Sequence, residues 1–410
     1  MEKQELIPHL FRTEYGKITA VLSKLFGIEN MEIAGDLASE TFLSALETWP
    51  YKGVPQNPKA WLYTVAKNKA LNYISRNNLF IGKITRDLRT ELTENDSVEI
   101  DLSEKNIADS QLQMLFAICH PAISVESQIA LALRTLCGFG IAEIANALLT
   151  NKETINKRLF RAREKLRLEK IEIEEPDSDE IEKRLETVLL TLYLLFNEGY
   201  YSESNDAVLR EDLCLEAMRL TYFLIANPQT NKPNVNSLLA LMCFHASRFA
   251  ARKNDNGEII LYHDQDELLW NTELINQGAF YLNQASAIST TLSKYYLEGT
   301  IAFWNTQKAD SVEKWENILH LYNLLLQYEY SPAAALNRVY AVSKVRGKEE
   351  GIKEALKLKL LNNPFYFALL GELYNNLDNN LAREYFEKAI DLTLTKSGKQ
   401  VLQKQLDLII

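Results

Sequence analysis

The sequence predicts an all-α protein of two to three domains, and three observations carry that prediction. Of the 410 residues, 47% are apolar and 24% charged, which is enough apolar material for large buried cores. Apolar residues recur at helical spacing, with few β-branched runs, from Ile7 to Asn77 and again from Ser124 to Lys170. Towards the end of the chain, similarity at a spacing of 34 residues indicates stacked pairs of helices.

The composition excludes several classes of protein. No apolar stretch reaches the roughly 18 residues that a membrane-spanning helix needs, and the N-terminus lacks the order of a secretory signal, so we expect a cytoplasmic protein without membrane insertion. Neither nucleotide-binding, hydrolase nor zinc-protease motifs are present, and we expect no metal and no cofactor. We therefore expect no enzyme. The cysteines stand apart in apolar stretches, which predicts reduced, buried thiols at Cys119, Cys137, Cys214 and Cys243.

Charge divides the chain into two unlike parts. Residues 1–170 hold 22 basic and 21 acidic side chains, a balance of +1, whereas residues 171–410 hold 23 and 34, a balance of −11. Within the first part, Asn151–Lys170 alone carries eight basic and three acidic residues. A local basic patch in an otherwise acidic chain indicates that the chain binds nucleic acid weakly and with the assistance of another component.

The first segment, residues 1–77, is predicted to be a bundle of helices. Met31–Trp49 should form one helix that ends at the next residue, a proline, because the loop up to Pro58 contains further helix breakers. Asn57 before Pro58 is a helix-start signal, an N-cap followed by proline at the first helical position. The next helix should therefore run from Pro58 to about Arg76.

Two helix faces in this segment carry candidate binding residues. On the 31–49 helix, Asp36, Glu40 and Glu47 align with Leu43 between them, which suits either a solvated face or a basic partner helix. The 58–76 helix should bury Leu62, Ala66, Ala70 and Tyr73 and expose a second stripe, Trp61, Thr64, Asn68 and Asn72, flanked by Lys59, Lys67 and Arg76. Aromatic and amide groups beside basic ones suit unstacked bases, although the aromatic residues could equally be packing residues.

A helix-turn-helix is predicted in the next part of the chain. Residues 78–110 lose helical periodicity and gain acid, which indicates a solvated linker before the domain at 111–170. In that domain three helices are expected, Ser124–Leu136, about Ile141–Leu148 and about Lys152–Glu169. A helix, a short helix, a tight turn and a basic third helix are typical of the DNA-binding motif.

The third of these helices should turn its basic face outward. Ile155, Leu159, Ala162 and Leu166 recur at helical spacing and should face the core. Short polar groups near the amino end could reach base edges, and the arginines that follow suit phosphates. The outward set is Lys152, Thr154, Asn156, Lys157, Arg158, Arg161 and Arg163. The alternative is a basic face that is merely solvated.

A second acidic linker, residues 171–182, precedes an all-helical extension at 183–410. Ala333, Leu336 and Tyr340 are followed 34 residues later by Phe367, Leu370 and Tyr374, which is the period of tetratricopeptide repeats. We expect a stack of this kind over roughly 290–410, with a concave surface for a partner.

A set of polar residues in the extension has two interpretations. They could form a buried network that holds helices together, or they could line a site for a ligand or peptide. The residues are Asn197, Glu198, Tyr200, His245, Arg248, Arg252, Asp264, Gln265 and Asp266. The last three do not make an EF-hand, since the required glycine and glutamate are absent.

Four segments carry a specific resemblance. They are Asp36-Leu-Ala-Ser-Glu40-Thr-Phe42, the stretch from Asn57 to Asn68, Glu143-Ile-Ala, and the stretch from Thr154 to Leu166. In order and spacing, over about 160 residues, they resemble regions 2 and 4 of bacterial extracytoplasmic-function sigma factors. Phe196-Asn-Glu-Gly-Tyr200, Leu213–Leu220, Ala240–Arg248 and Asp264-Gln-Asp266 resemble the long tetratricopeptide-like extension of one subgroup.

The resemblance implies a factor that binds core RNA polymerase and directs promoter-specific initiation of transcription. Asp36, Leu37, Glu40 and Phe42 would grip the clamp coiled coil of the β′ subunit, and the β subunit and promoter DNA would be further partners. The loop from Trp49, together with Trp61, Lys67, Asn68 and Asn72, would read and open the −10 element. The outward residues of the 152–169 helix would contact the −35 element in the major groove. Ala34-Gly35 departs from the family pattern, in which acidic residues often lie further upstream.

Two questions stay open at this point. The extension could mask the basic −35 reader, as the charges of +1 and −11 suggest, or it could hold the factor on polymerase or dock a protein partner. The second hypothesis for the whole chain is a repeat-bearing adaptor or regulator that uses its helix-turn-helix without polymerase. The acidic and aromatic faces of residues 31–76 argue against it.

Overall fold

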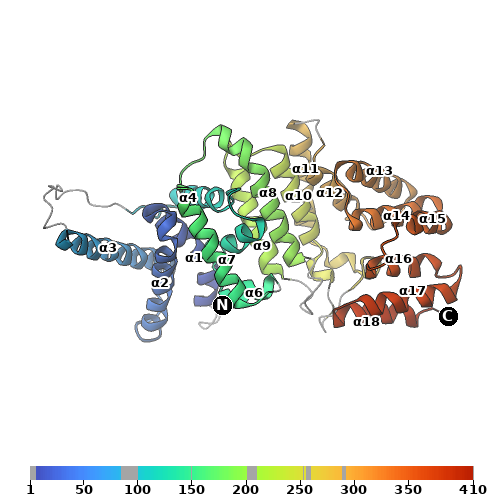
Figure 1. The fold of residues 1–410 in the computed structure, drawn as a ribbon, viewed down its shortest axis with the longest axis horizontal. Helices are drawn as coiled ribbons and strands as arrows, with labels where there is room; N and C mark the ends of the chain where they lie inside the picture. Colours follow the sequence, from blue (N-terminus) through green and yellow to red (C-terminus); the bar gives the residue numbers. More distant parts are fainter. Residues whose placement is uncertain are drawn as a thin grey trace. The chain divides into compact units, whose positions relative to one another are not determined.

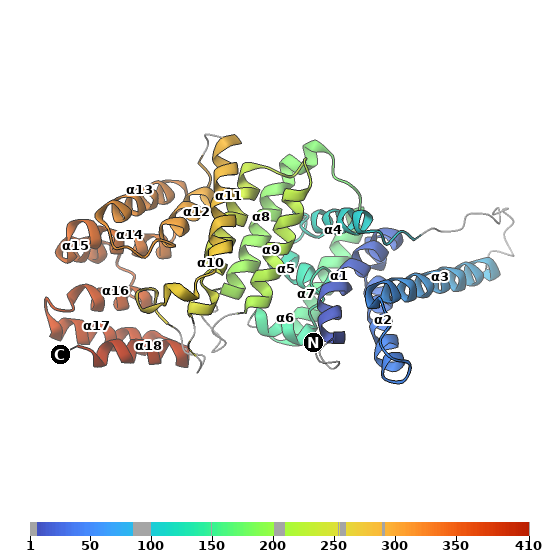
Figure 2. The ribbon, with the colours of Figure 1, turned by 180° about the vertical axis from the view of Figure 1, so that it is seen from behind.

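The computed structural model of the chain is helical throughout its described parts. These are residues 6–84, 100–148, 150–200, 210–252, 254, 260–288 and 292–409. All regular elements in them are α-helices or short 3-10 turns (Figures 1 and 2), so the predicted all-α class is confirmed. The chain divides into two compact units, Met1–Thr191 and Leu192–Ile410.

Three long helices begin the first unit and share one core. They are α1 (Leu6–Phe26), α2 (Met31–Lys52) and α3 (Pro58–Ile84), with a 3-10 turn, η1 (Ile28–Asn30), between the first two. The core contains Leu22, Phe42 and Leu62. At the start of α3, the N–H of Ala60 donates to the side-chain oxygen of Asn57 at 3.1 Å, as the helix-start signal predicts.

Both α2 and α3 extend beyond their predicted ends. Pro50 lies exposed in the last turn of α2, where water can satisfy the carbonyl that loses its partner, so the proline is tolerated. The helix ends instead at Gly53, whose φ of 83° suits glycine and whose N–H bonds to the carbonyl of Trp49 at 3.0 Å. The α3 helix continues to Ile84 rather than stopping near Arg76.

Part of the predicted linker at 78–110 is folded onto this core. Ser103 caps α4 (Glu104–Ile118) by accepting from the N–H of Asn106 at 3.4 Å. Ile100 and Ile107 are 5% and 4% exposed in the same core as α1 to α3. The acidic residues of this stretch predict a solvated linker, but the burial of these two isoleucines draws its carboxy-terminal part into the core. The stretch from 85 to 99 lies outside the described residues.

The helix-turn-helix has the predicted elements. They are α5 (Val125–Thr135), α6 (Ile141–Ala147) and α7 (Lys152–Leu168), each within a residue of its expected bounds. Gly138 makes the turn after α5 with a φ of +73°, which glycine adopts without strain. The predicted apolar stripe of α7 is buried, namely Ile155, Leu159, Ala162 and Leu166.

The second predicted linker, 171–182, is also partly ordered in this unit. Ile173 and Pro176 are buried, and α8 (Ser178–Tyr200) begins inside the segment. Arg184 on α8 donates to the carbonyl of Phe116, and the Thr191 hydroxyl donates to the side-chain oxygen of Gln128 at 2.8 Å. The first half of α8 therefore completes the core around α4 and α5, and the division between the units falls within α8.

The second unit begins with the rest of α8 and three helices, α9 (Glu211–Ala226), α10 (Pro233–Ala246) and α11 (Thr272–Ile288). Between α10 and α11 lie three 3-10 turns, η3 (Phe249–Arg252), η4 (Tyr262–Asp264) and η5 (Glu267–Leu269). Seven helices complete the chain: α12 (Lys294–Trp304), α13 (Val312–Tyr328), α14 (Pro332–Arg346), α15 (Lys348–Leu358), α16 (Pro364–Tyr374), α17 (Asn379–Leu392) and α18 (Lys396–Asp407).

The last helices form the stack that the 34-residue period predicts. Leu336 of α14 and its counterpart Leu370 of α16 lie in one core cluster with Phe367, and Tyr374 packs against it. Gly371 of α16 permits close packing on α17, since a Cβ there would lie 2.7 Å from the ring of Phe386. The helices follow one another as successive pairs (Figure 1).

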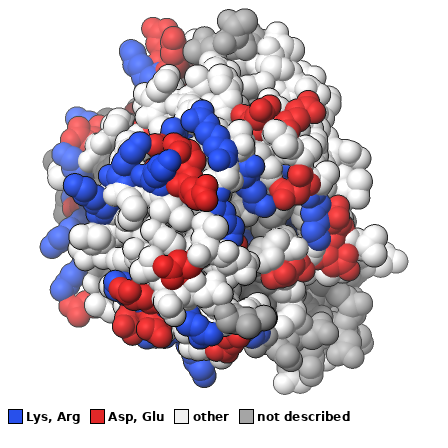
Figure 3. Space-filling model, turned by 90° about the vertical axis from the view of Figure 1, so that its right-hand side faces the viewer, with Lys and Arg blue, Asp and Glu red and all other residues white. Residues whose placement is uncertain are grey.

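The surface at the end of this stack carries mixed charge. Figure 3 shows Lys and Arg side chains intermixed with Asp and Glu on this face, with uncharged surface between them. A phosphate backbone is bound by a continuous basic surface. The face seen in Figure 3 has none.

One carboxyl group in the stack gives a pH-dependent prediction. Glu298 on α12 accepts a hydrogen bond from the Tyr193 hydroxyl at 3.3 Å, and burial raises its pKa from 4.5 to about 7 against the opposing effect of Lys294. The folded chain thus keeps a proton that the unfolded chain releases, so the contribution of Glu298 to the unfolding free energy falls as pH rises from 4.5 to about 7. We expect Glu298→Gln to raise the unfolding free energy by about 1–3 kcal/mol near pH 8.

Denaturant unfolding of the full chain at several pH values would measure this gain. The gain should vanish below pH 4.5, where the carboxyl is protonated in both states. Glu313→Gln, at an exposed position of α13, is the matched control and should change little at any pH. If Glu298→Gln raised the unfolding free energy equally at acidic and alkaline pH, Glu298 would not keep its proton in the folded chain.

Candidate nucleic-acid and polymerase interfaces

The amino-terminal half of α7 presents most of the predicted −35 residues to solvent. Asn151 caps the helix by accepting from the N–H of Thr154 at 2.7 Å, which orients the first turn. Lys152, Asn156, Lys157 and Arg161 are exposed, and Thr154 and Arg158 are half-buried. An exposed pair between Lys157 and Glu153, at 2.6 Å, is of the kind that contributes little stability and can exchange for phosphate.

The structure corrects the prediction for Arg163. Its guanidinium forms an ion pair with Glu32 at the start of α2, at 2.5 Å, so it faces α2 rather than the open side of α7. Phe160 is a residue that the sequence reasoning missed. It is 62% exposed between Lys157 and Arg161. Because Phe160 lies outside the buried apolar stripe of α7, the sequence could have indicated that it is exposed.

The acidic face of α2 is exposed, but two predicted partner residues are not. Asp36 and Glu40 are exposed, and Leu43 is 52% exposed between them and Glu47. Leu37 and Phe42 are 8% and 3% exposed and belong to the core that holds α2 in place. Leu46, beside the acidic face, is 53% exposed and was not predicted. The sequence of the helix alone does not show which of its apolar residues the neighbouring helices cover.

A buried carboxylate sets the orientation of α3 against α1. Glu14 is fully buried and accepts from the Tyr63 hydroxyl at 2.6 Å and from Lys17 at 3.0 and 3.1 Å, with Lys59 at 3.3 Å. Burial alone would raise the pKa of Glu14, but these donors hold it below its ordinary value. The result is a fixed platform for the −10 candidates.

That platform exposes amides and anchors the tryptophan. Asn68 and Asn72 are exposed with Thr64 along one side of α3, and Lys67 is half-buried. Trp61 is also half-buried, with its ring edge-on to Trp49 at 5.4 Å, so it serves partly as a packing residue. Tyr51, in the last turn of α2 before the loop, is 90% exposed and was not predicted.

Close packing joins α1 to the helix-turn-helix within the first unit. A Cβ on Gly16 would lie 2.0 Å from the carbonyl oxygen of Leu136, so only glycine fits there. A Cβ on Gly138 would lie 2.9 Å from the ring of Tyr15. With the pair of Arg163 and Glu32, these contacts place α7 beside the start of α2.

The polar set in the extension separates into two groups. Tyr200, His245 and Arg252 gather, with ring centroids of Tyr200 and His245 at 4.5 Å and the Arg252 guanidinium 3.9 Å from the Tyr200 ring centre. Arg248 donates to the Tyr200 hydroxyl at 3.4 Å. Burial, together with the nearby charges of Arg248 and Arg252, lowers the pKa of His245 well below its ordinary value. For these four residues the structure supports the network interpretation.

The other members of the set lie elsewhere. Gln265 is buried and donates to the carbonyl of Ile260 at 3.3 Å, while Asp266 caps η5 through the N–H of Leu268 at 2.9 Å. Asp264 is exposed beside His263. Asn197 and Glu198 are half-buried on α8, and burial raises the pKa of Glu198.

Among the described residues, no group of three or more His, Cys, Asp or Glu side chains is placed to hold a metal ion. None of the described helices combines the length and apolar character that a bilayer-spanning segment requires. All four cysteines are buried and none of them forms a disulfide, as predicted.

Comparison with known families identifies the first unit. Residues 10–79 match Sigma-70 region 2, and residues 119–166 match Sigma-70 region 4. The chain belongs to the sigma-70 family. The order and spacing of the two regions are those of an extracytoplasmic-function sigma factor, here with a carboxy-terminal extension. Residues 184–286 of the extension match a family of unknown function, DUF6596.

One relative spans nearly the whole sigma factor. An uncharacterized protein of Rhizobium meliloti (strain 1021) is 32% identical over 384 residues, which cover 92% of this chain and 90% of the relative. The relative therefore shares the extension as well as the sigma regions. No solved structure gives a significant match.

These matches establish the activity. The protein is a sigma factor that binds core RNA polymerase and promoter DNA and directs promoter-specific initiation of transcription. It is not an enzyme, because factors of this family select the promoter and leave the chemistry to polymerase. The exposed faces of α2, α3 and α7 carry several of the residues that the sequence predicts for these contacts.

Proposed function

We propose that this sigma factor divides its contacts among three helices. The acidic face of α2, with Asp36 and Glu40, binds the clamp coiled coil of the β′ subunit. The side of α3 with Lys67, Asn68 and Asn72 reads and opens the −10 element, assisted by Trp61 and the α2–α3 loop. The open face of α7 contacts the −35 element in the major groove. The β subunit is a further partner, and the site of action is the cytoplasm, where the chromosome is transcribed.

The observation that carries this proposal is the exposure of the three faces in one folded unit. Asp36, Glu40, Asn68, Asn72, Asn156 and Arg161 are all exposed, whereas the residues between them at helical spacing fill the core. Acid on α2 and base on α7 suit a basic protein partner and an anionic duplex, respectively. An autonomous DNA-binding regulator would have no use for the first of these faces.

The experiment combines the purified chain with core polymerase and a library of genomic promoters, followed by sequencing of the transcripts. We expect transcripts from promoters that share −35 and −10 elements. We expect Arg158→Ala to reduce the amount of these transcripts about tenfold or more. Arg167→Ala, in the last turn of the same helix, is the matched control. A chain that shifts duplex DNA alone and never joins polymerase would favour the adaptor hypothesis.

We further infer that the extension regulates the factor by masking α7. The support is the difference between +1 in residues 1–170 and −11 in residues 171–410. An acidic body tethered to a basic DNA reader competes with DNA for it. The tetratricopeptide-like stack would also offer a surface for a protein partner.

Truncation tests the masking, and the structure decides where to cut. Removal of residues 171–410 would strip the first half of α8, with Arg184 and Thr191, from region 4. A chain that ends at Tyr200 keeps this packing. We expect such a chain to give more transcripts than the full chain, by up to about tenfold, in the promoter assay. Unchanged or lost activity, with the fold confirmed by circular dichroism, would instead indicate that the extension holds the factor on polymerase.

A further inference from the structure

We propose that a pocket between the 260–264 segment and helices α16 to α18 binds a small organic cation with an apolar body. The pocket lies within the second unit and has a volume of about 470 Å³. That volume is within the range of about 300–1,000 Å³ found for small-molecule sites. It is separate from the polymerase and DNA faces, so the inference does not rest on the proposed function.

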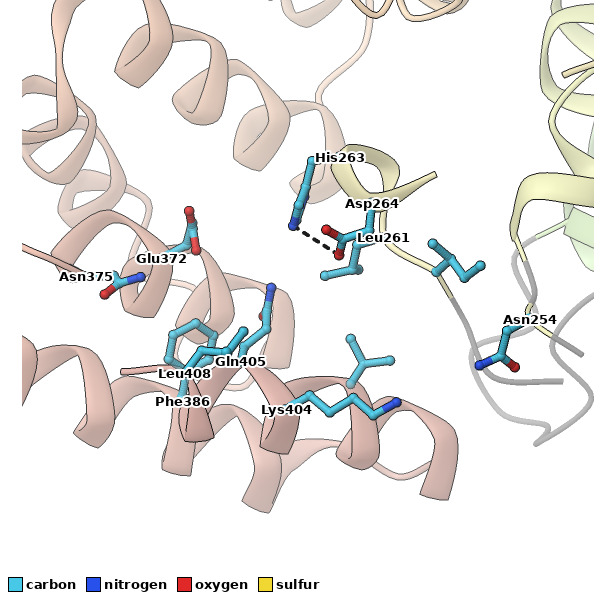
Figure 4. A pocket seen from close by; sticks show the side chains of 12 residues that line it. Asn254, Leu261, His263, Asp264, Glu372, Asn375, Phe386, Lys404, Gln405 and Leu408 are labelled. Carbon is cyan, nitrogen blue, oxygen red and sulfur yellow. Dashed lines mark ion pairs between the residues drawn. The ribbon is translucent and has the colours of Figure 1, made fainter. Parts of the chain in front are cut away.

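Apolar side chains form one part of the lining. They come from two places far apart in the sequence, Ile260 and Leu261 on one side and Phe386, Val401 and Leu408 on the other. Figure 4 shows Leu261 on the η4 side, Phe386 on α17 and Leu408 at the end of α18. Such a lining excludes water from an apolar ligand body and favours a ligand over a free ion.

Carboxylates supply the charge. Asp264 and Glu372 both line the pocket, from η4 and α16. Among the described residues the Glu372 carboxylate has no hydrogen bond or ion pair, while Asp264 pairs only with the exposed His263, at 3.3 Å. Glu372 is half-buried, so water screens its attraction to a cation in the pocket less than on an open surface.

Side-chain amides in the lining can accept hydrogen bonds from the charged amine of the ligand. Asn375 and Gln405 line the same pocket, and in Figure 4 the Gln405 side chain extends towards His263 and Asp264. The backbone carbonyls of Glu372 and Asn375 are already engaged by the amine of Lys348, at 3.2 and 2.8 Å, so the side chains are the acceptors left for a ligand. In the same view the amine of Lys404 points away from Glu372 and Asp264.

The pocket also joins two parts of the extension. The 260–264 segment belongs to the stretch that matches the family of unknown function, whereas α16 to α18 lie beyond it. A ligand held by Asp264 on one side and Glu372 on the other would tie the two parts together. The extension would thereby respond to the concentration of the cation.

The test uses the full chain and three matched probes: tryptamine, the neutral 3-ethylindole and the anionic indole-3-acetate. Saturation-transfer NMR and calorimetry would measure binding. We expect tryptamine to bind with a dissociation constant on the order of 1 mM and the other two at least about fivefold more weakly. Asp264→Asn combined with Glu372→Gln should weaken tryptamine about tenfold and leave 3-ethylindole unchanged.

Glu387→Gln, at an exposed position of α17 outside the pocket lining, is the control and should bind tryptamine as the wild type does. Addition of about 0.5 M salt should weaken tryptamine more than 3-ethylindole, because screening acts on the charged probe. Equal binding of the three probes, no binding of tryptamine at all, or binding that survives the double substitution would each overturn the proposal.

Discussion

Reversal of charge at Asp36 should strongly weaken assembly with core RNA polymerase. Asp36 is exposed on an acidic face that also includes Glu40 and Glu47, so Asp36→Arg removes an attraction to a basic partner helix and adds a repulsion. We expect the dissociation constant to rise about 100-fold, as measured by fluorescence anisotropy of labelled chain with core polymerase. Transcripts from promoters that carry the shared −35 and −10 elements should disappear.

The matched control is Glu182→Arg, which makes the same change of charge at an exposed position of α8. It should leave assembly nearly unchanged. If both substitutions weaken assembly equally, long-range charge rather than a docking face is responsible. If Asp36→Arg assembles as well as the wild type, the assignment of the α2 face is wrong.

Neighbouring apolar residues refine the same experiment. Leu43→Ala, at a half-exposed position, should weaken assembly without changing stability, whereas Phe42→Ala should lower the unfolding free energy by about 3–5 kcal/mol because Phe42 fills the core. Loss of assembly in Phe42→Ala at a temperature where region 2 is still folded would show that Phe42 leaves the core to meet polymerase.

Gly16→Ala should destabilise the first unit, although alanine favours a helix. At an ordinary helix position the change would stabilise by about 1 kcal/mol. Here the new Cβ would lie 2.0 Å from the carbonyl oxygen of the buried Leu136, and backbone cannot move aside as a flexible side chain can. We expect a net loss of about 1–3 kcal/mol in urea unfolding.

The same substitution should loosen region 4 from region 2. The contact of α1 with Leu136 and the pair of Arg163 with Glu32 act between the same two regions, so failure of the first weakens the second. Small-angle scattering should report a larger radius of gyration for Gly16→Ala. Thr13→Ala, on the exposed side of α1, is the control and should be neutral or slightly stabilising. A stabilised, equally compact Gly16→Ala chain would mean that the two regions do not pack in solution.

The sequence by itself determined the local features of this protein. The starts of α3 and α7, the apolar stripe of α7 and the family follow from helical spacing, capping residues and motif order, because these depend on neighbours within a turn or two. The repeat period likewise predicted that Leu336 of α14 and Leu370 of α16 occupy equivalent places in one core, whereas Ala333 is exposed and Tyr340 packs against another cluster.

The tertiary structure alone decided which predicted residues are available. Leu37 and Phe42 are buried while Leu43 is exposed, Arg163 is held by Glu32, and Ile100 and Ile107 turn a predicted linker into part of the core. The physical reason is that the partners of these residues come from helices distant in the sequence. A single helix shows which residues share a face, but only its packing shows which face meets water.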